Sequence, residues 1–100
     1  MDNLATTPPQ IPLAEVIEAR LASALSPTRL VVSNDSAQHS GHMGDDGSGE
    51  SHFSVTVEAA AFTGKSRVER QRLVNTALAD LLAERIHALA IKATAPGEGA

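Results

Sequence analysis

The stretch SHFSVTVEAAAFTGKSRVERQRLVNTALADLLAERIHALAIKA, residues 51–93, decides the fold. Its first nine residues alternate between apolar and polar side chains, the pattern of a strand with one covered face. A turn follows, in which Ser66 with Glu69 three residues later predicts a capping box at a helix start. Apolar residues then recur at helical spacing over 67–85, and a second apolar run over 86–94 predicts another strand. The stretch therefore reads strand, helix, strand.

The preceding residues add a helix and a strand. Apolar residues from Leu13 to Leu25 fall on one helical stripe, which ends before Ser26-Pro27 because the residue before a proline avoids the α region. The run TRLVVSND, residues 28–35, predicts a strand. Residues 36–50 hold four glycines without apolar periodicity and predict a long loop.

The expected architecture is an α+β sandwich of two layers in the order α-β-β-α-β. The first two strands can pair as an antiparallel hairpin, and a right-handed crossover makes the last two strands parallel. This gives a three-stranded mixed sheet with both helices on one face. We expect a disordered tail over 1–12, one domain over 13–95 and a short tail over 96–100.

The amino-acid composition argues against several classes of function for this protein. The chain has no cysteine, so it supplies neither a catalytic thiol nor a thiolate metal ligand. Its net charge of −4 argues against DNA binding over the whole surface, and no apolar run reaches the length of a membrane span. The sequence offers no catalytic triad, phosphate-binding glycine loop or supported carboxylate pair. We therefore expect a cytoplasmic protein that is not an enzyme and does not bind membranes.

Two histidines stand at the start of the last two predicted strands. His52 and His87 would lie close together at one sheet edge if those strands are parallel neighbours. Imidazole is a competent ligand for iron, but a cysteine-free chain needs a partner to supply thiolates. Residue 87 has the same parity as Leu89 and Ile91, so strict alternation would turn its side chain toward the helices.

The motifs of residues 51–93 resemble those of the BolA family. The resemblance rests on SHFSVTV, on FTGKSRVERQRLVN and on LLAERIHALAIKA, and it covers roughly residues 13–96. It implies a fold like the second type of KH domain and a heterodimer with a monothiol glutaredoxin. That partner would hold a [2Fe-2S] cluster with its own cysteine and glutathione, and the isolated chain would bind no cofactor tightly. The implied role is an adaptor in iron–sulfur cluster trafficking or iron regulation.

The resemblance implies that His87 is one cluster ligand and that the second comes from the region before the second strand. The candidates are His52, His39 and His42. We favour His52 because a strand anchors it, whereas ligands on a loop must first be ordered. His39 and His42, with Asp45 and Asp46 nearby, could also bind a metal on their own.

A cluster of cations supports an alternative function. Four basic residues crowd the start of the second long helix, although a helix N-terminus favours anions. They are Lys65, Arg67, Arg70 and Arg72. The alternative is a DNA-binding transcriptional regulator that uses these cations on a KH-like fold, and a weak homodimer is a further partner to consider. The family often has a histidine where this chain has Gln71, which bears on partner contacts rather than on ligation.

Overall fold

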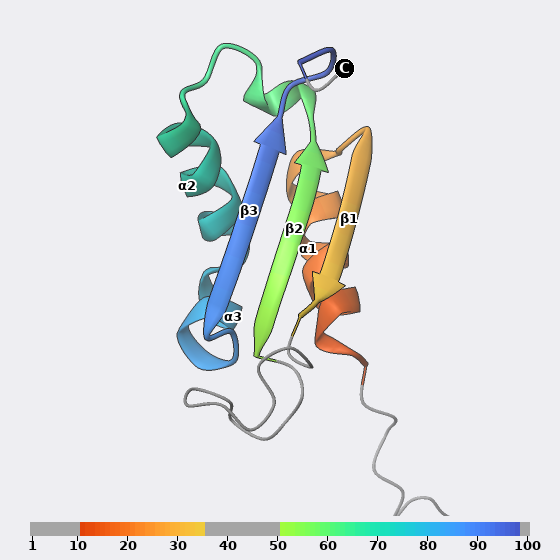
Figure 1. The fold of residues 1–100 in the computed structure, drawn as a ribbon, viewed down its shortest axis with the longest axis vertical. Helices are drawn as coiled ribbons and strands as arrows, with labels where there is room; N and C mark the ends of the chain where they lie inside the picture. Colours follow the sequence, from red (N-terminus) through yellow and green to blue (C-terminus); the bar gives the residue numbers. More distant parts are fainter. Residues whose placement is uncertain (1–10, 36–50, 99–100) are drawn as a thin grey trace, which may run out of the picture.

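The computed structural model describes residues 11–35 and 51–98 (Figure 1). The predicted loop over 36–50 and nearly all of the predicted tail over 1–12 lie outside the described residues. The elements are α1 (Leu13–Leu25), β1 (Arg29–Asn34), β2 (His52–Glu58), the short 3₁₀ helix η2 (Ala60–Phe62), α2 (Arg67–Ala77), α3 (Ala79–Glu84) and β3 (Ala88–Thr94).

The three strands form one mixed sheet in the order β1-β2-β3. β1 runs antiparallel to β2, with Val32 opposite Val55, and β3 runs parallel to β2, with His52 opposite Ala88. The crossover between β2 and β3 contains η2, α2 and α3 (Figure 1). The predicted α+β architecture and strand pairing are confirmed.

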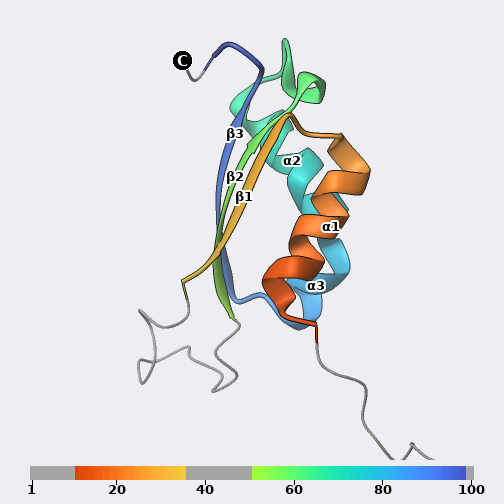
Figure 2. The same ribbon diagram turned by 90° about the vertical axis from the view of Figure 1, so that its right-hand side faces the viewer.

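The helices of the described residues cover one face of the sheet, and none of them lies on the other face (Figure 2). Alternate residues of β2 are buried against the helices, as the apolar-polar alternation predicts. On α1 the buried residues recur every four positions, so one helical stripe faces the sheet. The buried apolar side chains of the core are Leu13, Ile17, Leu21, Leu25, Phe53, Val55, Val57, Ala59, Phe62, Val74, Leu78, Leu81, Ile86 and Ala95.

The prediction of one continuous helix over 67–85 is wrong. The structure has two helices there, and the second ends one residue earlier. The backbone breaks at Leu78, whose N–H is shared between the carbonyls of Val74 and Asn75 at 3.2 Å each. The break gives two shorter helices that both bury apolar residues. Leu78, which lies between them, is itself fully buried. The second piece ends at Glu84, and β3 begins at residue 88 rather than 86.

The start of α2 matches its prediction. The Ser66 hydroxyl accepts from the Glu69 N–H at 3.2 Å, while the Glu69 carboxylate accepts from the Ser66 N–H at 2.7 Å. These two bonds satisfy N–H groups that have no partner within the helix. Hydrogen bonding from Ser66 also lowers the pKa of Glu69. The capping box is therefore confirmed.

An ion pair connects helix α1 to helix α3. The Arg20 guanidinium on α1 donates to both carboxylate oxygens of Asp80 on α3, at 2.6 and 2.9 Å. The pair is largely exposed, so its contribution to stability is small compared with that of the buried core. Among residues 11–35 and 51–98, no helix combines the length and apolar character that membrane crossing requires.

We predict that Phe62→Ala destabilises the fold by about 3–5 kcal/mol, because it removes a fully buried ring and leaves a cavity. Urea denaturation followed by far-UV circular dichroism measures the change. The control is Val68→Ala on α2, whose side chain is 56% exposed and whose loss should alter the free energy of unfolding by at most about 0.5 kcal/mol. Equal effects of the two substitutions would contradict this account of the core.

Candidate functional site

His52 and His87 lie beside each other at one end of the sheet. Their ring centroids are 6.1 Å apart and the ring planes meet at 70°. His52 is the first residue of β2, and His87 directly precedes β3. Parallel pairing brings these two strand starts to the same end of the sheet (Figure 1). The predicted proximity of the two imidazoles is therefore present.

Ser51 determines the spacing of the two histidines. Its carbonyl oxygen accepts from the His87 N–H at 2.8 Å and from the Ala88 N–H at 3.2 Å, which joins the start of β3 to the start of β2. Its hydroxyl lies 2.9 Å from Nδ1 of His52. Ser51 itself is fully buried, so the junction is anchored in the packed part of the domain.

The side chain of His87 is exposed, and that of His52 is half-buried. Strict alternation, which would turn residue 87 toward the helices, therefore does not bury it. His87 precedes the first ladder residue of β3, so the alternation that turns Leu89 and Ile91 toward the helices does not apply to it. A reagent or a partner can reach the His87 imidazole from solvent.

Polar groups from the end of β1 border His52. A hollow of about 260 Å³ lies over the first residues of β2 and β3, and Asp35 and Ser54 line it together with His52. The Asp35 carboxylate accepts hydrogen bonds from the hydroxyls of Ser33 and Ser54. The Asp35 N–H donates to the His52 carbonyl at 2.7 Å, so β1 also helps to fix the backbone of the histidine.

Two imidazoles alone make an incomplete metal site. The described residues contain no group of three His, Cys, Asp or Glu side chains placed to hold a metal ion. The alternative ligands His39 and His42, with Asp45 and Asp46, lie outside the described residues. Within the described residues, the pair at 52 and 87 can therefore contribute two nitrogen ligands and no third.

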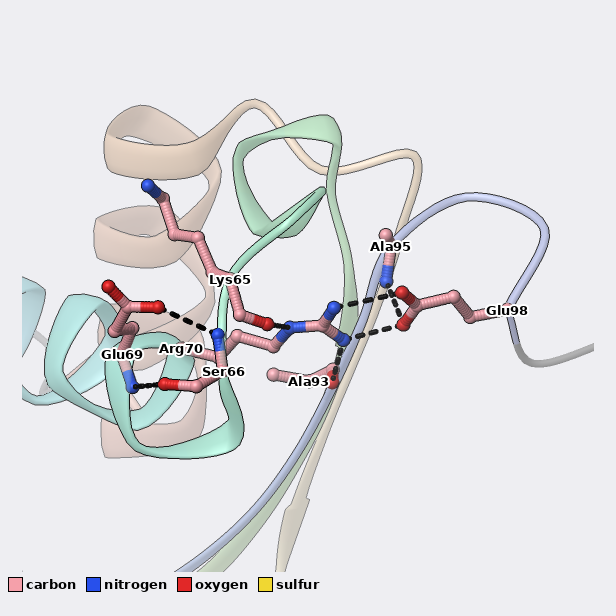
Figure 3. Close-up of polar contacts among 7 residues, drawn as sticks. All are labelled: Lys65, Ser66, Glu69, Arg70, Ala93, Ala95 and Glu98. Carbon is pink, nitrogen blue, oxygen red and sulfur yellow. Dashed lines mark hydrogen bonds and ion pairs between the residues drawn. The ribbon is translucent and has the colours of Figure 1, made fainter.

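The cations at the start of α2 do not form one uniform surface. The side chains of Lys65, Arg67 and Arg72 are exposed, but Arg70 is only 13% exposed because it turns toward the C-terminal end of the chain. Its guanidinium donates to both carboxylate oxygens of Glu98, at 2.5 and 2.8 Å, and to the Ala93 carbonyl (Figure 3). Arg70 is thus already paired with a carboxylate.

The family-model comparison matches residues 21–98 to "BolA-like protein". The chain belongs to the BolA-like family. The match includes both histidines, the cation cluster and Glu98, so the whole site described above falls within the family domain. The resemblance to the BolA family that the sequence motifs indicated is therefore confirmed.

Three relatives illustrate what this BolA-like chain is similar to. A Sinorhizobium sp. protein, "Uncharacterized protein in cobS 5'region", is 49% identical over 87 residues, which are 86% of this chain and 94% of that protein. The "DNA-binding transcriptional regulator BolA" of Vibrio cholerae is 47% identical over 79 residues, covering 79% of this chain and 71% of that one. The solved "BolA domain of SufE1 from Arabidopsis thaliana" superposes with a TM-score of 0.79 at 38% identity, covering 90% and 99%.

Sequence reasoning missed the partner of Arg70 in this BolA-like domain. Glu98 falls in the predicted C-terminal tail, yet its carboxylate accepts from Arg70 and, at 3.0 Å, from the Ala95 N–H. Pro96-Gly97 forms the intervening turn, in which Gly97 has a φ of 90°, a value that side chains disfavour. Only this turn signal was available from the sequence, because the partners are 28 residues apart.

We predict that the Glu98 carboxylate titrates far below an ordinary glutamate. Hydrogen bonding from Arg70 and from the Ala95 N–H lowers the pKa of Glu98 to about 2. A depressed folded-state pKa means that the pair stabilises the turn above about pH 4.5 and that this contribution is lost as the pH falls toward 2. Carboxyl-carbon NMR titration measures it, and Arg70→Gln, which removes the main cause, should raise the midpoint toward 4.5. A parental midpoint near 4.5 would contradict the predicted pair.

Proposed function

We propose that this BolA-like protein is an adaptor that pairs with a monothiol glutaredoxin and co-ligates a [2Fe-2S] cluster through His87 and His52. The glutaredoxin would contribute its cysteine and glutathione as the sulfur ligands. The role would be iron–sulfur cluster trafficking or iron regulation. Family membership supports the partner class, and one observation carries the ligand assignment: two imidazoles 6.1 Å apart at the start of paired strands.

The spacing of the rings fits a shared metal. Metal–imidazole bonds of about 2 Å place two rings on one metal roughly 5 Å apart between centroids. The observed 6.1 Å requires the rings to approach by about 1 Å, which side-chain rotation of the exposed His87 can provide. The backbones of the two histidines are joined through the Ser51 carbonyl, so a small rotation of the side chains suffices to reach ligating geometry.

The Ser51 hydroxyl supports ligation by His52. When Nδ1 of His52 carries the ring proton, the Ser51 oxygen accepts it and the lone pair lies on Nε2. Metal-ligating histidines commonly have their second ring nitrogen held in this way, which fixes the tautomer and the ring orientation. Ser51 is thus suited to a supporting role behind the ligand.

The donor set explains why a partner is needed. The chain has no cysteine, and iron–sulfur clusters depend on thiolate ligands. Substitution of histidine for thiolate on one iron raises the reduction potential of a two-iron cluster, and this is the chemistry that the bound cluster supplies. Because only neutral imidazole ligates, acidification should weaken this protein's hold on the cluster.

We predict that His87→Ala abolishes the change in the visible circular dichroism spectrum that the parental chain produces in a cluster-loaded monothiol glutaredoxin. The physical reason is the loss of a nitrogen ligand from iron. His52→Ala should weaken the change, whereas the double variant His39→Ala/His42→Ala should retain it. Size-exclusion chromatography on each mixture separates loss of ligation from loss of pairing.

The matched control for this experiment is Arg29→Ala, an exposed residue at the start of β1, at the end of the sheet away from the two histidines. It should reproduce the parental spectrum. A parental spectrum from the His87→Ala mixture refutes ligation by His87. Retention by His52→Ala together with loss in the His39→Ala/His42→Ala variant moves the second ligand to residues 36–50.

The second candidate function is DNA-binding transcriptional regulation. It is favoured by the similarity to the Vibrio cholerae protein with that name and by the exposed cations Lys65, Arg67 and Arg72. Arg70 contributes less than its position suggested, because contact with a phosphate would require it to leave Glu98. Such binding would be largely electrostatic and would weaken steeply with added salt.

We predict for this candidate that Lys65→Glu/Arg67→Glu/Arg72→Glu abolishes binding of duplex DNA at 50 mM salt while Arg70→Gln leaves most of it. The slope of log affinity against log salt should fall by about one for each phosphate contact removed. Fluorescence anisotropy with a labelled duplex measures both quantities. Equal affinity of the triple variant and the parent at the same salt eliminates this function.

A further inference from the structure

A cationic groove lies between the start of α2 and the outer edge of β3. Its volume is about 400 Å³. The charged side chains that line it are all basic, in a chain whose net charge is −4. They are Lys65, Arg67, Arg70 and Lys92. Ile91 and Ala93 of β3 form part of its wall, so a strand backbone and a set of cations border the same space.

No strand of the described residues pairs with the side of β3 that faces the groove. β3 is an edge strand. Ala88 donates to Ser51 and Thr94 accepts from Ala59, so the even-numbered residues hydrogen-bond toward β2. The N–H and C=O groups of Leu89, Ile91 and Ala93 therefore point outward. Arg70 reaches the Ala93 carbonyl from that outer side, which confirms the direction.

One of the cations that line this groove already holds a carboxylate. Glu98 accepts from Arg70 in the bidentate geometry that guanidinium groups form with carboxylates (Figure 3). The Ala95 N–H donates to the same carboxylate at 3.0 Å. The Glu98 side chain remains 45% exposed, so solvent and other carboxylates have access to the pair.

We propose that this groove is a docking site for a short, acidic, extended segment of a partner protein. The segment adds to the open edge of β3 by main-chain hydrogen bonds to Leu89 and Ile91. Its carboxylates pair with Lys65, Arg67 and Lys92, and one of them competes with Glu98 for Arg70. The cations of the site lie toward the Ala93 end of β3, whereas the two histidines lie at the start of β2 and β3.

The groove suits an acidic peptide better than a nucleic acid. An open strand edge presents alternating N–H and C=O groups, which match a peptide backbone and not a sugar-phosphate backbone. Single-stranded nucleic acids are commonly held by stacking on exposed aromatic rings, and the two aromatic residues of the chain, Phe53 and Phe62, are buried. The anion that Arg70 holds is a carboxylate.

The test uses the full chain and a fluorescein-labelled octapeptide that alternates glutamate and threonine. A glutamine–threonine octapeptide of the same length controls for charge, and an oligothymidylate with four phosphates tests the nucleic-acid alternative. Anisotropy measures affinity. Amide hydrogen exchange by NMR identifies the contact, because an added strand should slow exchange of the Leu89 and Ile91 N–H groups.

The main variant is Arg67→Glu/Lys92→Glu, both exposed residues of the groove. We expect it to weaken binding of the acidic octapeptide roughly tenfold, and the matched double reversal Arg29→Glu/Arg85→Glu, outside the groove, less than twofold. Glu98→Gln should instead strengthen binding several-fold, because it removes the competing carboxylate from Arg70. A merely structural role of Glu98 would not produce that gain.

Preferential binding of the glutamate octapeptide, with slowed exchange at Ile91, supports the proposal. Several results overturn it: no octapeptide binding up to millimolar concentration, equal binding of the glutamine octapeptide, or tighter binding of the oligothymidylate. Weaker binding by Glu98→Gln, or equal losses in the two double reversals, also overturns it. None of these outcomes depends on cluster ligation, so this proposal and the glutaredoxin proposal fail separately.

Discussion

The carbonyl oxygen of Ser51 is the contact on which the arrangement of the domain depends. Two successive N–H groups, those of His87 and Ala88, donate to it and set the register of the parallel pair β2-β3. A parallel pair cannot be closed by a tight turn, so η2, α2 and α3 must cross the sheet before β3 can begin. The crossover brings the helical layer over the buried side chains of β2, and the junction brings two histidines together.

Local signals in the sequence were sufficient for most of the fold. The alternation in β2, the capping box at Ser66 and the end of α1 at Leu25 each depend on neighbouring residues, and each is found where it was expected. The break at Leu78 had no such signal, since neither proline nor glycine marks it. The leucine at the break is fully buried, and apolar periodicity continues across it, so periodicity alone cannot reveal the interruption.

The histidine pair was predictable because strand order and direction alone bring residues 52 and 87 together. The exposure of His87 was not, because it depends on whether the ladder starts at residue 87 or 88. The difference among the four basic residues near the start of α2 could not be predicted from the sequence. Four basic residues look equivalent in the sequence, yet Arg70 differs from the others through Glu98, a contact between distant segments that no local pattern encodes.

The parallel pairing that joins the histidines also separates them from the cationic groove. β3 begins directly after His87, and Arg70 and Glu98 meet near Ala93, so six residue steps of extended chain, roughly 20 Å, separate the two places. An acidic segment docked along the edge of β3 would therefore leave the His87 imidazole accessible. A partner that engages both ends would gain effective concentration at the histidines without occupying them. Under the two proposals, pairing with a partner and ligation of its metal would depend on different ends of β3 and could be tuned independently.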